Sequence, residues 1–452
     1  MKLSGWGRYP TVNAELLAPA GQAALSNWLQ AGPSGSSIAR GQGRSYGDSA
    51  LSETVLSSRH LDHFLELDVE QGELHCAAGV TLAEILQMIV PKGLFLPVVP
   101  GTRFVSLGGA VAADIHGKNH HRDGCISNHV QSLTLMLASG EVRTCSREQD
   151  SELFAATCGG MGLTGIILDV RLSLIKVSGV FIRNQQYVAS NLTHCIELLE
   201  EYQQARYSVA WIDCLSTGAA SGRGIVYLGE HAGNPAPARA ASNVRGPRLS
   251  VPFSTPGWLL NRHSMSAFNN LYYWRQSRRD AQSLVHYQQY FFPLDSIGNW
   301  NRLYGGRGFQ QYQLVLPDDS AGTGISEILK RVAQAGKGSF LAVLKQFGEA
   351  NNMPLSFPRA GLTLTLDFKM EPDLPELLNE LDAIVQHHGG RLYLAKDARM
   401  SEAMFKSGYP EWQRFMAIRN EVDPQARFSS LQSRRLGLDP STAHPAPVQC
   451  QS

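Results

Sequence analysis

The sequence has almost no net charge, no paired cysteines and no long hydrophobic run. Its 452 residues carry 40 Lys and Arg against 39 Asp and Glu, a formal charge of +1, which excludes an electrostatic case for a nucleic-acid-binding protein. The seven cysteines are scattered and form no CxxC pair, so we expect reduced, buried thiols in a cytosolic protein rather than a disulfide frame or a zinc site. No window approaches the ~18–20 apolar residues of a membrane-spanning helix. The first ten residues, MKLSGWGRYP, lack the apolar region of a signal peptide.

The composition that remains is that of a globular protein. Hydrophobic residues make up 43% of the chain, which argues against disorder. The length exceeds what one core supports, so two domains or one domain with a large insertion are expected. Glycine motifs crowd residues 1–176, an α+β pattern fills residues 177–390, and a C-terminal segment follows at 391–438. Residues 439–452, rich in Pro, Ala and Ser, are expected to be a disordered tail.

The stretch Pro100–His121, PGTRFVSLGGAVAADIHGKNHH, holds most of the candidate chemistry. Its glycines allow backbone to approach a bulky ligand, because no Cβ intervenes. Its second half brings imidazoles, a cation and an amide within a few residues. We therefore predict a cofactor at the glycine end and a reacting centre at the other.

The same histidines also suggest a metal site. His116 and His120 are four residues apart, as zinc ligands on a helix are. Gly117 and Asn119 disfavour a helix at this point, and no acidic third ligand lies in a fitting context. No metal is expected.

Two further glycine loops flank this stretch. Gly41–Ala50, GQGRSYGDSA, is rich in free N–H groups that can cradle an anion, although an ordinary glycine turn is an alternative. Cys158–Gly165, CGGMGLTG, formally satisfies the Rossmann pattern GxGxxG. A predicted helix precedes it, a predicted strand follows it, and Gln185 stands where an acidic residue belongs, which reverses the Rossmann context. A loop that lets backbone approach a cofactor remains open.

The second half contains three candidate strands with alternating character. They are Gly308–Leu316, Ser339–Phe347 and Leu362–Phe368, and together they predict a sheet with one polar face. Such a face suits a substrate that carries hydroxyls or phosphate. A fourth candidate strand, Arg391–Asp397, ends on Lys396, whose charge must be needed or reach water.

The segment between the two halves has three interpretations. Gly233–Pro256 is a long loop, and basic and bulky apolar residues follow it as far as Trp274. It predicts a mobile lid, a membrane-surface contact or an ordinary surface loop.

Four stretches together resemble one family. SGWGRYP, GQGRSYGD, PGT…GGAVAADIHGKNHH and YLAKDAR…VDPQARFSS are similar to those of the decaprenylphosphoryl-β-D-ribose 2′-oxidases, flavoenzymes of the vanillyl-alcohol-oxidase-like superfamily. The resemblance implies a two-domain α+β fold. A PCMH-type FAD-binding domain is built from both chain ends, with a substrate domain on an antiparallel sheet inserted between them.

The resemblance also implies the reaction. The 2′-hydroxyl of a polyprenyl-phosphoryl ribose is oxidised to a ketone, and a separate NAD(P)H-dependent keto-reductase completes epimerisation to the arabinose donor. The substrate is a lipid-linked sugar phosphate, which implies a cytoplasmic protein that visits the inner face of the membrane. The alternatives are an FAD-dependent oxidase of soluble sugar alcohols or aldonolactones, and a catalytically idle flavoprotein.

Carried over position by position, the resemblance assigns three sets of residues. The catalytic set is Lys396, His116 and Lys118. The cofactor set is Gly41, Gly43, Arg44, Ser45, Tyr46, Gly47, Asp48, Gly101, Thr102, Gly108, Gly109, Ala113, His116, Gly117, Asn119, Gly162, Gly165, Ile166, Tyr393 and Lys396. The substrate set is Lys118, Gln311, Gln313, Lys345, Phe347, Thr363 and Thr365.

Two departures qualify these assignments. Thr365 stands where mycobacterial members carry a cysteine, so their covalent inhibition by nitroaromatic compounds is not implied here. The first glycine loop contains no histidine, so the FAD is expected to be non-covalent.

The chemistry needs particular groups beside the flavin. A cation, Lys396 or Lys118, stabilises the negative charge of the reduced ring. A proton acceptor must reach the hydroxyl, and His116 or a desolvated lysine is suited to that role. Lys345 is a candidate partner for the substrate phosphate.

Overall fold

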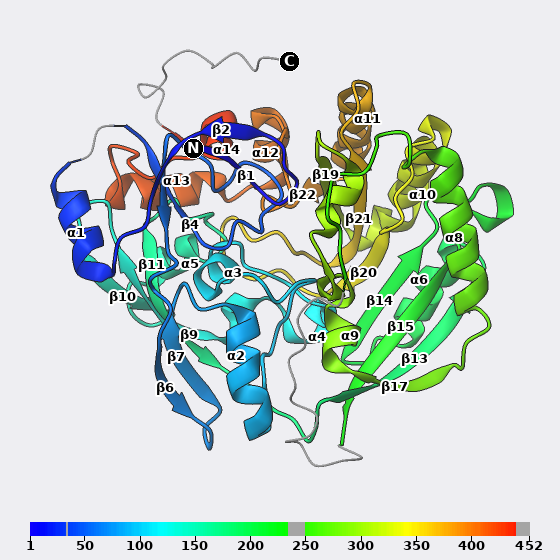
Figure 1. The fold of residues 1–452 in the computed structure, drawn as a ribbon, viewed down its shortest axis with the longest axis horizontal. Coiled ribbons are helices and arrows are strands. Elements are labelled where there is room, and N and C mark those ends of the chain that lie inside the picture. Colours follow the sequence, from blue (N-terminus) through cyan, green and yellow to red (C-terminus); the bar gives the residue numbers. More distant parts are fainter. Residues whose placement is uncertain (33–34, 234–248, 440–452) are drawn as a thin grey trace.

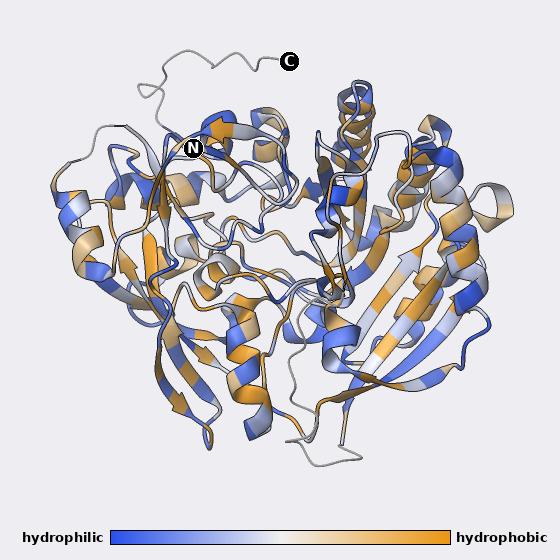
Figure 2. Ribbon diagram, in the orientation of Figure 1, coloured by the Kyte–Doolittle hydropathy of each residue, from blue (hydrophilic) through white to orange (hydrophobic). Residues whose placement is uncertain are grey.

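Two antiparallel sheets, one on each side of Figure 1, carry the fold. The computed structural model describes residues 1–32, 35–233 and 249–439. Most of the predicted loop 233–256 and of the predicted tail 439–452 lies outside these residues. Figure 2 shows hydrophobic residues along the strands of both sheets and on the helix α2, Leu82–Ile89.

The first sheet has five strands in the order β10-β9-β11-β7-β6. Their bounds are β6 Phe64–Asp68, β7 Glu73–Ala77, β9 Val130–Met136, β10 Val142–Ser146 and β11 Ile166–Ser173. The helix α5, Ser151–Thr157, precedes β11, so CGGMGLTG connects a helix to a strand and is not a Rossmann turn. The helix α2 begins with a capping box, in which the Thr81 hydroxyl accepts from the Glu84 N–H at 3.2 Å.

The two ends of the chain meet beside this sheet. A parallel sheet of β3 (Glu15–Leu17), β5 (Thr54–Ser57) and β4 (Ser37–Arg40) borders Phe428, which bridges to Ser37. The Ser37 N–H donates to Arg427 O, and the Ser429 N–H donates to Ser37 O, both at 2.9 Å. Three C-terminal helices lie beside the N-terminal strands in Figure 1, namely α12 Glu402–Gly408, α13 Trp412–Val422 and α14 Leu431–Arg435.

The second sheet has eight strands in the order β17-β13-β15-β14-β20-β21-β19-β22. Their bounds are β13 Phe181–Ala189, β14 Tyr207–Ile212, β15 Gly224–Ala232, β17 Gln282–His286, β19 Phe309–Leu316, β20 Val343–Phe347, β21 Gly361–Lys369 and β22 Arg391–Leu392. The three predicted strands, β20, β21 and β19, are adjacent in this sheet and lie next to its edge strand β22, with Gln313 opposite Thr365 and Gln311 opposite Asp367. The Gln311 amide donates to Asp367 at 2.6 Å on the face that these side chains share, so the predicted polar face is confirmed. The opposite face also contains a polar pair, because the Tyr312 hydroxyl donates to Asp382 at 2.8 Å.

Helices cover the apolar face of the large sheet. They are α6 Leu192–Glu201, α10 Asp318–Ala335 and α11 Leu374–His387. The helix α8, Arg262–Gln276, packs near β15. The remaining elements are β1 Lys2–Ser4, β2 Thr11–Asn13, α1 Gln22–Gln30, β8 Leu94–Phe95, α3 Leu107–Ala112, α4 His120–Asp123, β12 Ile175–Lys176, β16 Leu249–Ser250, α9 Tyr287–Phe291 and β18 Ile297–Gly298, with short 3-10 turns at 90–92, 126–129, 218–220, 293–296 and 300–304.

Three predicted elements were too long. The apolar run Leu94–Val99 has the character of a strand throughout, but the strand ends at Phe95, because Pro97 has no N–H to pair and its carbonyl accepts instead from Asn119. The strand expected over 339–347 begins at Val343, since the Ser339 hydroxyl and N–H bond to other segments. The strand expected over 391–397 ends at Leu392. The N–H groups of Lys396 and Asp397 both donate to Tyr393 O, at 3.0 and 3.1 Å, so Lys396 lies on a turn.

Candidate active site

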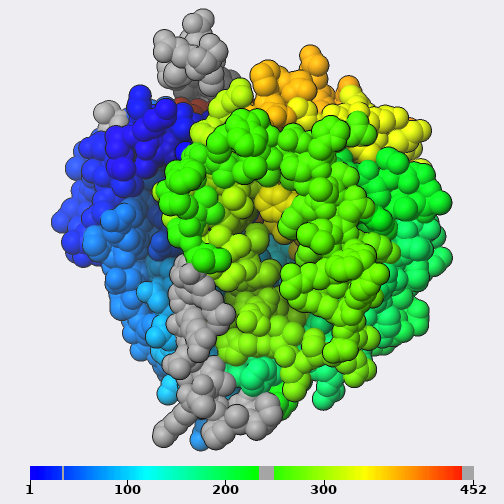
Figure 3. All heavy atoms as spheres, turned by 45° about the vertical axis from the view of Figure 1, so that its right-hand side comes forward, coloured from blue at the N-terminus to red at the C-terminus, as the bar shows by residue number. Residues whose placement is uncertain are grey.

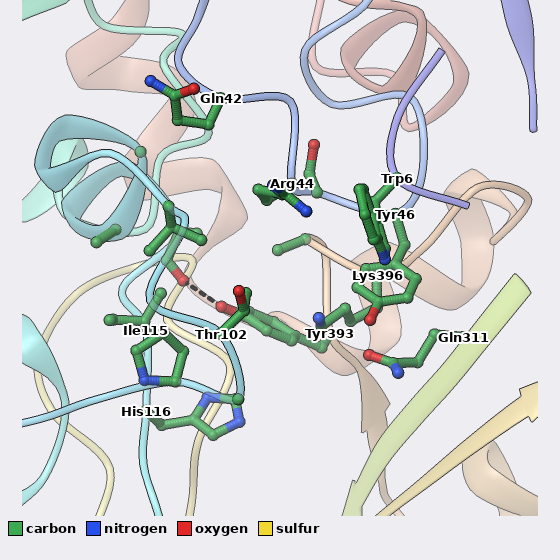
Figure 4. Close-up of a pocket in the computed structure, with 18 of the residues that line it drawn as sticks. Trp6, Gln42, Arg44, Tyr46, Thr102, Ile115, His116, Gln311, Tyr393 and Lys396 are labelled. Carbon is green, nitrogen blue, oxygen red and sulfur yellow. Dashed lines mark hydrogen bonds between the residues drawn. The ribbon is translucent and has the colours of Figure 1, made fainter. Parts of the chain in front are cut away.

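A cavity of about 450 Å³ lies between the glycine loops and the polar face of the large sheet. Figure 3 shows a hollow in the face that the green part of the chain forms, and Tyr272, Phe291 and Pro293 of that part line the cavity. Figure 4 shows Trp6, Tyr46 and Lys396 close together, with Tyr393 between them and His116. Segments that are far apart in the sequence therefore build one chamber.

Most of the predicted site residues line this cavity. They are Gly41, Gly43, Arg44, Ser45, Tyr46, Gly101, Thr102, Gly108, Gly109, Ala113, His116, Gly117, Lys118, Gly162, Gly165, Ile166, Gln311, Gln313, Lys345, Thr365, Tyr393 and Lys396. Five others stand behind the lining, namely Gly47, Asp48, Asn119, Phe347 and Thr363. The contacts of these five within the protein are to groups that support the lining.

Asp48 belongs to a buried ion-pair joint. Its carboxylate accepts two hydrogen bonds from Arg435 at 2.8 and 3.2 Å, and Arg435 also donates to Asp397 at 2.8 Å. The Tyr46 N–H donates to Ala395 O at 3.0 Å. The joint thereby holds the first glycine loop against the turn that carries Lys396.

The remaining four residues behind the lining also have structural partners. The Asn119 amide donates to Pro97 O at 2.7 Å and to Asp123 at 2.6 Å. Phe347 lies edge-on to the His116 ring at 4.8 Å, and Thr363 accepts from Gln313 at 3.4 Å. Gly47 is packed against Asp397, where a Cβ would lie 1.6 Å from the carbonyl oxygen.

Glycines let the segments that form the cavity wall pack closely against one another. A Cβ on Gly41 would lie 2.0 Å from the Ser106 hydroxyl, and one on Gly108 would lie 2.7 Å from Ala78 Cβ. The backbone at Gly162 and Gly165 has φ of +80° and +157°, which favours glycine. Backbone therefore forms much of this wall, as a site for a dinucleotide requires.

Three lysines, Lys118, Lys345 and Lys396, also line the cavity. Burial lowers the pKa of Lys345 to about 8 and, with the charge of Lys345 added, the pKa of Lys118 to about 7. Burial also lowers the pKa of Lys396 to about 7, against the opposing effect of Asp367. None of the three forms a salt bridge within the described part of the chain. Three buried lysines without a salt-bridge partner among these residues favour an anionic occupant, because an anion stabilises the charged form of a buried amine.

The environments of two of these lysines differ. The Lys118 ammonium donates to Tyr290 O and lies 4.1 Å from the centre of the Tyr290 ring. The Lys396 ammonium lies 3.9 Å from the centre of the Tyr46 ring. The Lys118 ammonium therefore has a hydrogen bond to a backbone carbonyl. The Lys396 ammonium lies against an aromatic ring instead and has no hydrogen-bond partner among the described residues.

His116 is buried and neutral. Burial, with the charges of Lys345, His120 and Lys396, places its pKa well below 6.5. Its Nε2 accepts from the Gln313 amide at 2.9 Å, while its Nδ1 has no hydrogen-bond partner among the described residues. A buried polar atom without a partner marks a place where a ligand atom fits.

A polar network supports the sheet wall. The Gln311 amide donates to Asp367 at 2.6 Å, and the Tyr304 hydroxyl donates to the same carboxylate at 3.2 Å. Burial raises the pKa of Asp367 to about 6. Tyr393 is fixed on the other side, where its hydroxyl donates to Ala113 O at 2.8 Å (Figure 4).

Several lining residues were not predicted. Trp6 is one of them, and the guanidinium of the predicted residue Arg44 lies 4.1 Å from the centre of its ring. Asp295 is another, and it accepts from the hydroxyl of the predicted residue Thr102 at 2.7 Å. Trp211, Tyr227 and Tyr272 add an aromatic wall. The sequence could have indicated Trp6, because this residue belongs to the motif SGWGRYP. The other missed residues belong to no motif.

The described residues offer few other sites. Their six cysteines are free and buried, as predicted, and Cys450 lies outside the described part. No group of three or more His, Cys, Asp or Glu side chains is placed to hold a metal in residues 1–32, 35–233 and 249–439. In the same ranges, no helix combines the length and the apolar character needed to span a bilayer.

Comparisons with known proteins define the class. Residues 24–146 match the FAD binding domain family, and residues 361–436 match the D-arabinono-1,4-lactone oxidase family. Together with the cavity, these matches make the chain an FAD-dependent oxidoreductase. The predicted α+β fold, with an FAD-binding domain and a large antiparallel sheet, is confirmed.

Longer similarities define the family. The decaprenylphosphoryl-β-D-ribose oxidase of Mycolicibacterium smegmatis is 37% identical over 450 residues, covering 97% of each chain. An uncharacterised protein of Streptomyces coelicolor is 34% identical over 79% of this chain and 100% of its own. The L-gulonolactone oxidase of Scyliorhinus torazame is 27% identical over 30% of this chain and 31% of its own. The chain belongs to the decaprenylphosphoryl-β-D-ribose oxidase family.

The joint at Gly47 predicts how FAD is retained. In Gly47→Ala the new methyl group collides with the Asp397 carbonyl, so the first glycine loop must move away from the turn of Lys396. We expect the purified variant to hold less than about a tenth of the FAD per chain that the parent holds, since a misplaced loop loses its backbone contacts. The ratio of visible flavin absorbance to protein absorbance measures this.

Gly306→Ala is the matched control, because a Cβ at Gly306 has no atom within 4 Å. It should retain FAD like the parent. Full FAD occupancy in Gly47→Ala would contradict the role given to the joint.

Proposed function

We propose that this chain oxidises the 2′-hydroxyl of a polyprenyl-phosphoryl-β-D-ribose to the 2′-keto product. The observation that carries the proposal is the set of three buried lysines that line the cavity, Lys118, Lys345 and Lys396, none of which forms a salt bridge within the residues that the structure describes. A sugar phosphate supplies the missing negative charge. The relative that matches 97% of the chain is named for such a substrate.

Lys345 is proposed to hold the substrate phosphate. It stands on β20, opposite Thr363, at the polar face of the sheet, where a phosphate gains a charge-assisted contact in a desolvated setting. Gln311, Gln313 and Thr365 line the same face and are proposed to bind the hydroxyls of the sugar.

Lys396 is proposed to stand beside the flavin as a fixed positive charge. FAD, when bound, accepts the hydride that leaves the sugar carbon. The turn at 393–397 and the Tyr46 ring hold the ammonium in one place, so its charge is already oriented when negative charge develops.

Lys118 is proposed to accept the hydroxyl proton. Its pKa of about 7 matches the working pH of a general base. His116 is a weaker base because its pKa lies far lower and its Nε2 already accepts from Gln313. We assign His116 to positioning, through contacts with Gln313 and Phe347.

The flavin is proposed to be non-covalent. His116 is the one histidine among the described lining residues, and those residues include no cysteine. A ring nitrogen engaged with Gln313 is poorly placed to form a bond to flavin.

The wider setting is also part of the proposal. We infer an FAD-binding domain at 1–176 with the returning segment 391–438, and a substrate domain at 177–390. We further infer a cytoplasmic protein that contacts the inner face of the membrane, and a separate NAD(P)H-dependent keto-reductase that consumes the ketone.

A second candidate function has one observation in its favour. The match of residues 361–436 to D-arabinono-1,4-lactone oxidase suggests an oxidase of soluble sugar alcohols or aldonolactones. Such substrates carry no phosphate, so they leave the charge of Lys345 unpaired.

Anaerobic reduction distinguishes the two candidates. We expect a short-chain polyprenyl-phosphoryl ribose to bleach the visible flavin absorbance, and L-gulono-1,4-lactone to leave it unchanged. Bleaching by the lactone alone would overturn the proposal.

A Lys345→Met variant should raise KM for the phosphorylated substrate at least about tenfold, because a charge-assisted contact to phosphate is lost.

The lysines also predict a narrow pH profile. At low pH Lys118 is protonated and cannot accept a proton, whereas at high pH Lys396 and Lys345 lose theirs, with pKa values of about 7 and 8. We expect kcat/KM to pass through a maximum near pH 7, because the pKa values of the base Lys118 and of the required cation Lys396 both lie at about 7. In Lys118→Met the acid limb should disappear, while His116→Gln should keep both limbs at a lower rate. An acid limb that persists in Lys118→Met would contradict the assignment of the base.

A further inference from the structure

The helix α8 has its amphipathic pattern reversed. Its buried side chains include Asn269 and Gln276, whereas Leu271 and Trp274 are 61% and 53% exposed. A helix on a protein surface ordinarily buries its apolar face and exposes its polar one. The polar side chains are buried for a structural reason, because the Asn269 amide donates to Asp213 at 2.9 Å.

Exposed apolar side chains concentrate around this helix. Of the fifteen large hydrophobic residues that are exposed in the described chain, seven fall between Leu249 and Trp274. Five of them join two arginines in what we name the α8 surface. It consists of Trp258, Leu259, Phe268, Leu271, Trp274, Arg275 and Arg278.

The charged side chains of the α8 surface are all positive. Residues 249–279 contain four arginines and no aspartate or glutamate. Arg278 lies 4.3 Å from the centre of the Trp274 ring, and no ion pair engages these arginines within the described residues. Exposed tryptophan and leucine beside unpaired arginine is the composition of a surface that lies on anionic lipid.

The α8 surface is held rigidly and lies beside the cavity. The Lys369 ammonium donates to Gly257 O at 2.6 Å, and the Asn261 amide donates to Trp258 O at 2.9 Å, which fixes the turn before α8. Tyr272 of the same helix lines the cavity, where its hydroxyl lies 3.0 Å from that of Tyr227. Helix α8 therefore has one side on the substrate chamber and another on solvent, on the hollowed face of Figure 3.

We propose that the α8 surface docks on an anionic phospholipid membrane and brings the mouth of the cavity to the bilayer. A lipid-linked sugar phosphate then enters with its head group toward Lys345, while its chain stays in lipid. The purpose of this docking rests on the proposed function, but the docking itself does not. A protein partner is disfavoured, because arginines without matching acidic groups suit a fluid anionic surface more than a fixed one.

Vesicle flotation of the FAD-loaded full chain tests the docking. We expect binding to vesicles of phosphatidylcholine with a third phosphatidylglycerol, weaker binding to phosphatidylcholine alone, and release by high salt. Arg275→Gln with Arg278→Gln should lower the partition coefficient about 25-fold, at about fivefold for each arginine. Leu271→Ser with Trp274→Ser should lower it at least about tenfold.

The matched control changes exposed apolar residues elsewhere. Leu65→Ser with Val69→Ser, on and next to strand β6, should bind vesicles like the parent. All variants should oxidise a short-chain, detergent-dispersed substrate at the parent rate, which shows that they fold. Parental chains that stay off anionic vesicles, or α8 variants that still bind them, would overturn the docking.

Failure of the docking and failure of the proposed function give different results. Vesicle binding without oxidation of any polyprenyl-phosphoryl ribose leaves the α8 surface standing and removes the substrate. Oxidation of that substrate without vesicle binding supports the proposed function and overturns the docking of the α8 surface.

Discussion

The double ion pair of Arg435 with Asp48 and Asp397 is the contact on which the site depends. The three residues come from the first glycine loop, the turn after β22 and the last helix. Both carboxylates are buried, and buried carboxylates need such a partner to remain charged. Because Tyr46 and Lys396 lie within two residues of these carboxylates, the same joint sets the position of the lysine over the tyrosine ring.

The joint also explains the division of the cavity. On its N-terminal side, loops without Cβ atoms form a wall of backbone, where a cofactor can lie close. On its far side, the large sheet presents alternating polar side chains, with lysines that have no carboxylate partner. We propose that the reacting centre lies where the wall of backbone and the charged sheet meet, beside Lys396, Tyr393 and His116, which line the cavity there (Figure 4).

Local patterns in the sequence predicted much of this arrangement. Strict alternation predicted which side chains of β19 and β21 share a face, because the period of a strand determines it. The resemblance brought together Gly41, His116 and Lys396, which no spacing could join. What local patterns missed depends on tertiary contacts. Asp48 was expected at the cofactor, but its partner Arg435 lies 387 residues away. Lys396 was expected on a strand, but the carbonyl of Tyr393 closes a turn there. The burial of polar side chains on α8 could not be predicted from the sequence either, because it depends on the hydrogen bond that Asn269 donates to the distant residue Asp213.

We propose that the positive charge of Lys396 stabilises the reduced flavin. The most direct measurement is the midpoint potential of the bound FAD at neutral pH, in the parent chain and in Lys396→Met. Lys406→Met serves as the control, since its ammonium pairs with Glu402 on the exposed helix α12. The account predicts a fall of about 30 mV or more in Lys396→Met, which for two electrons is about 1.4 kcal/mol, and no change in Lys406→Met. A potential in Lys396→Met equal to that of the parent would contradict it.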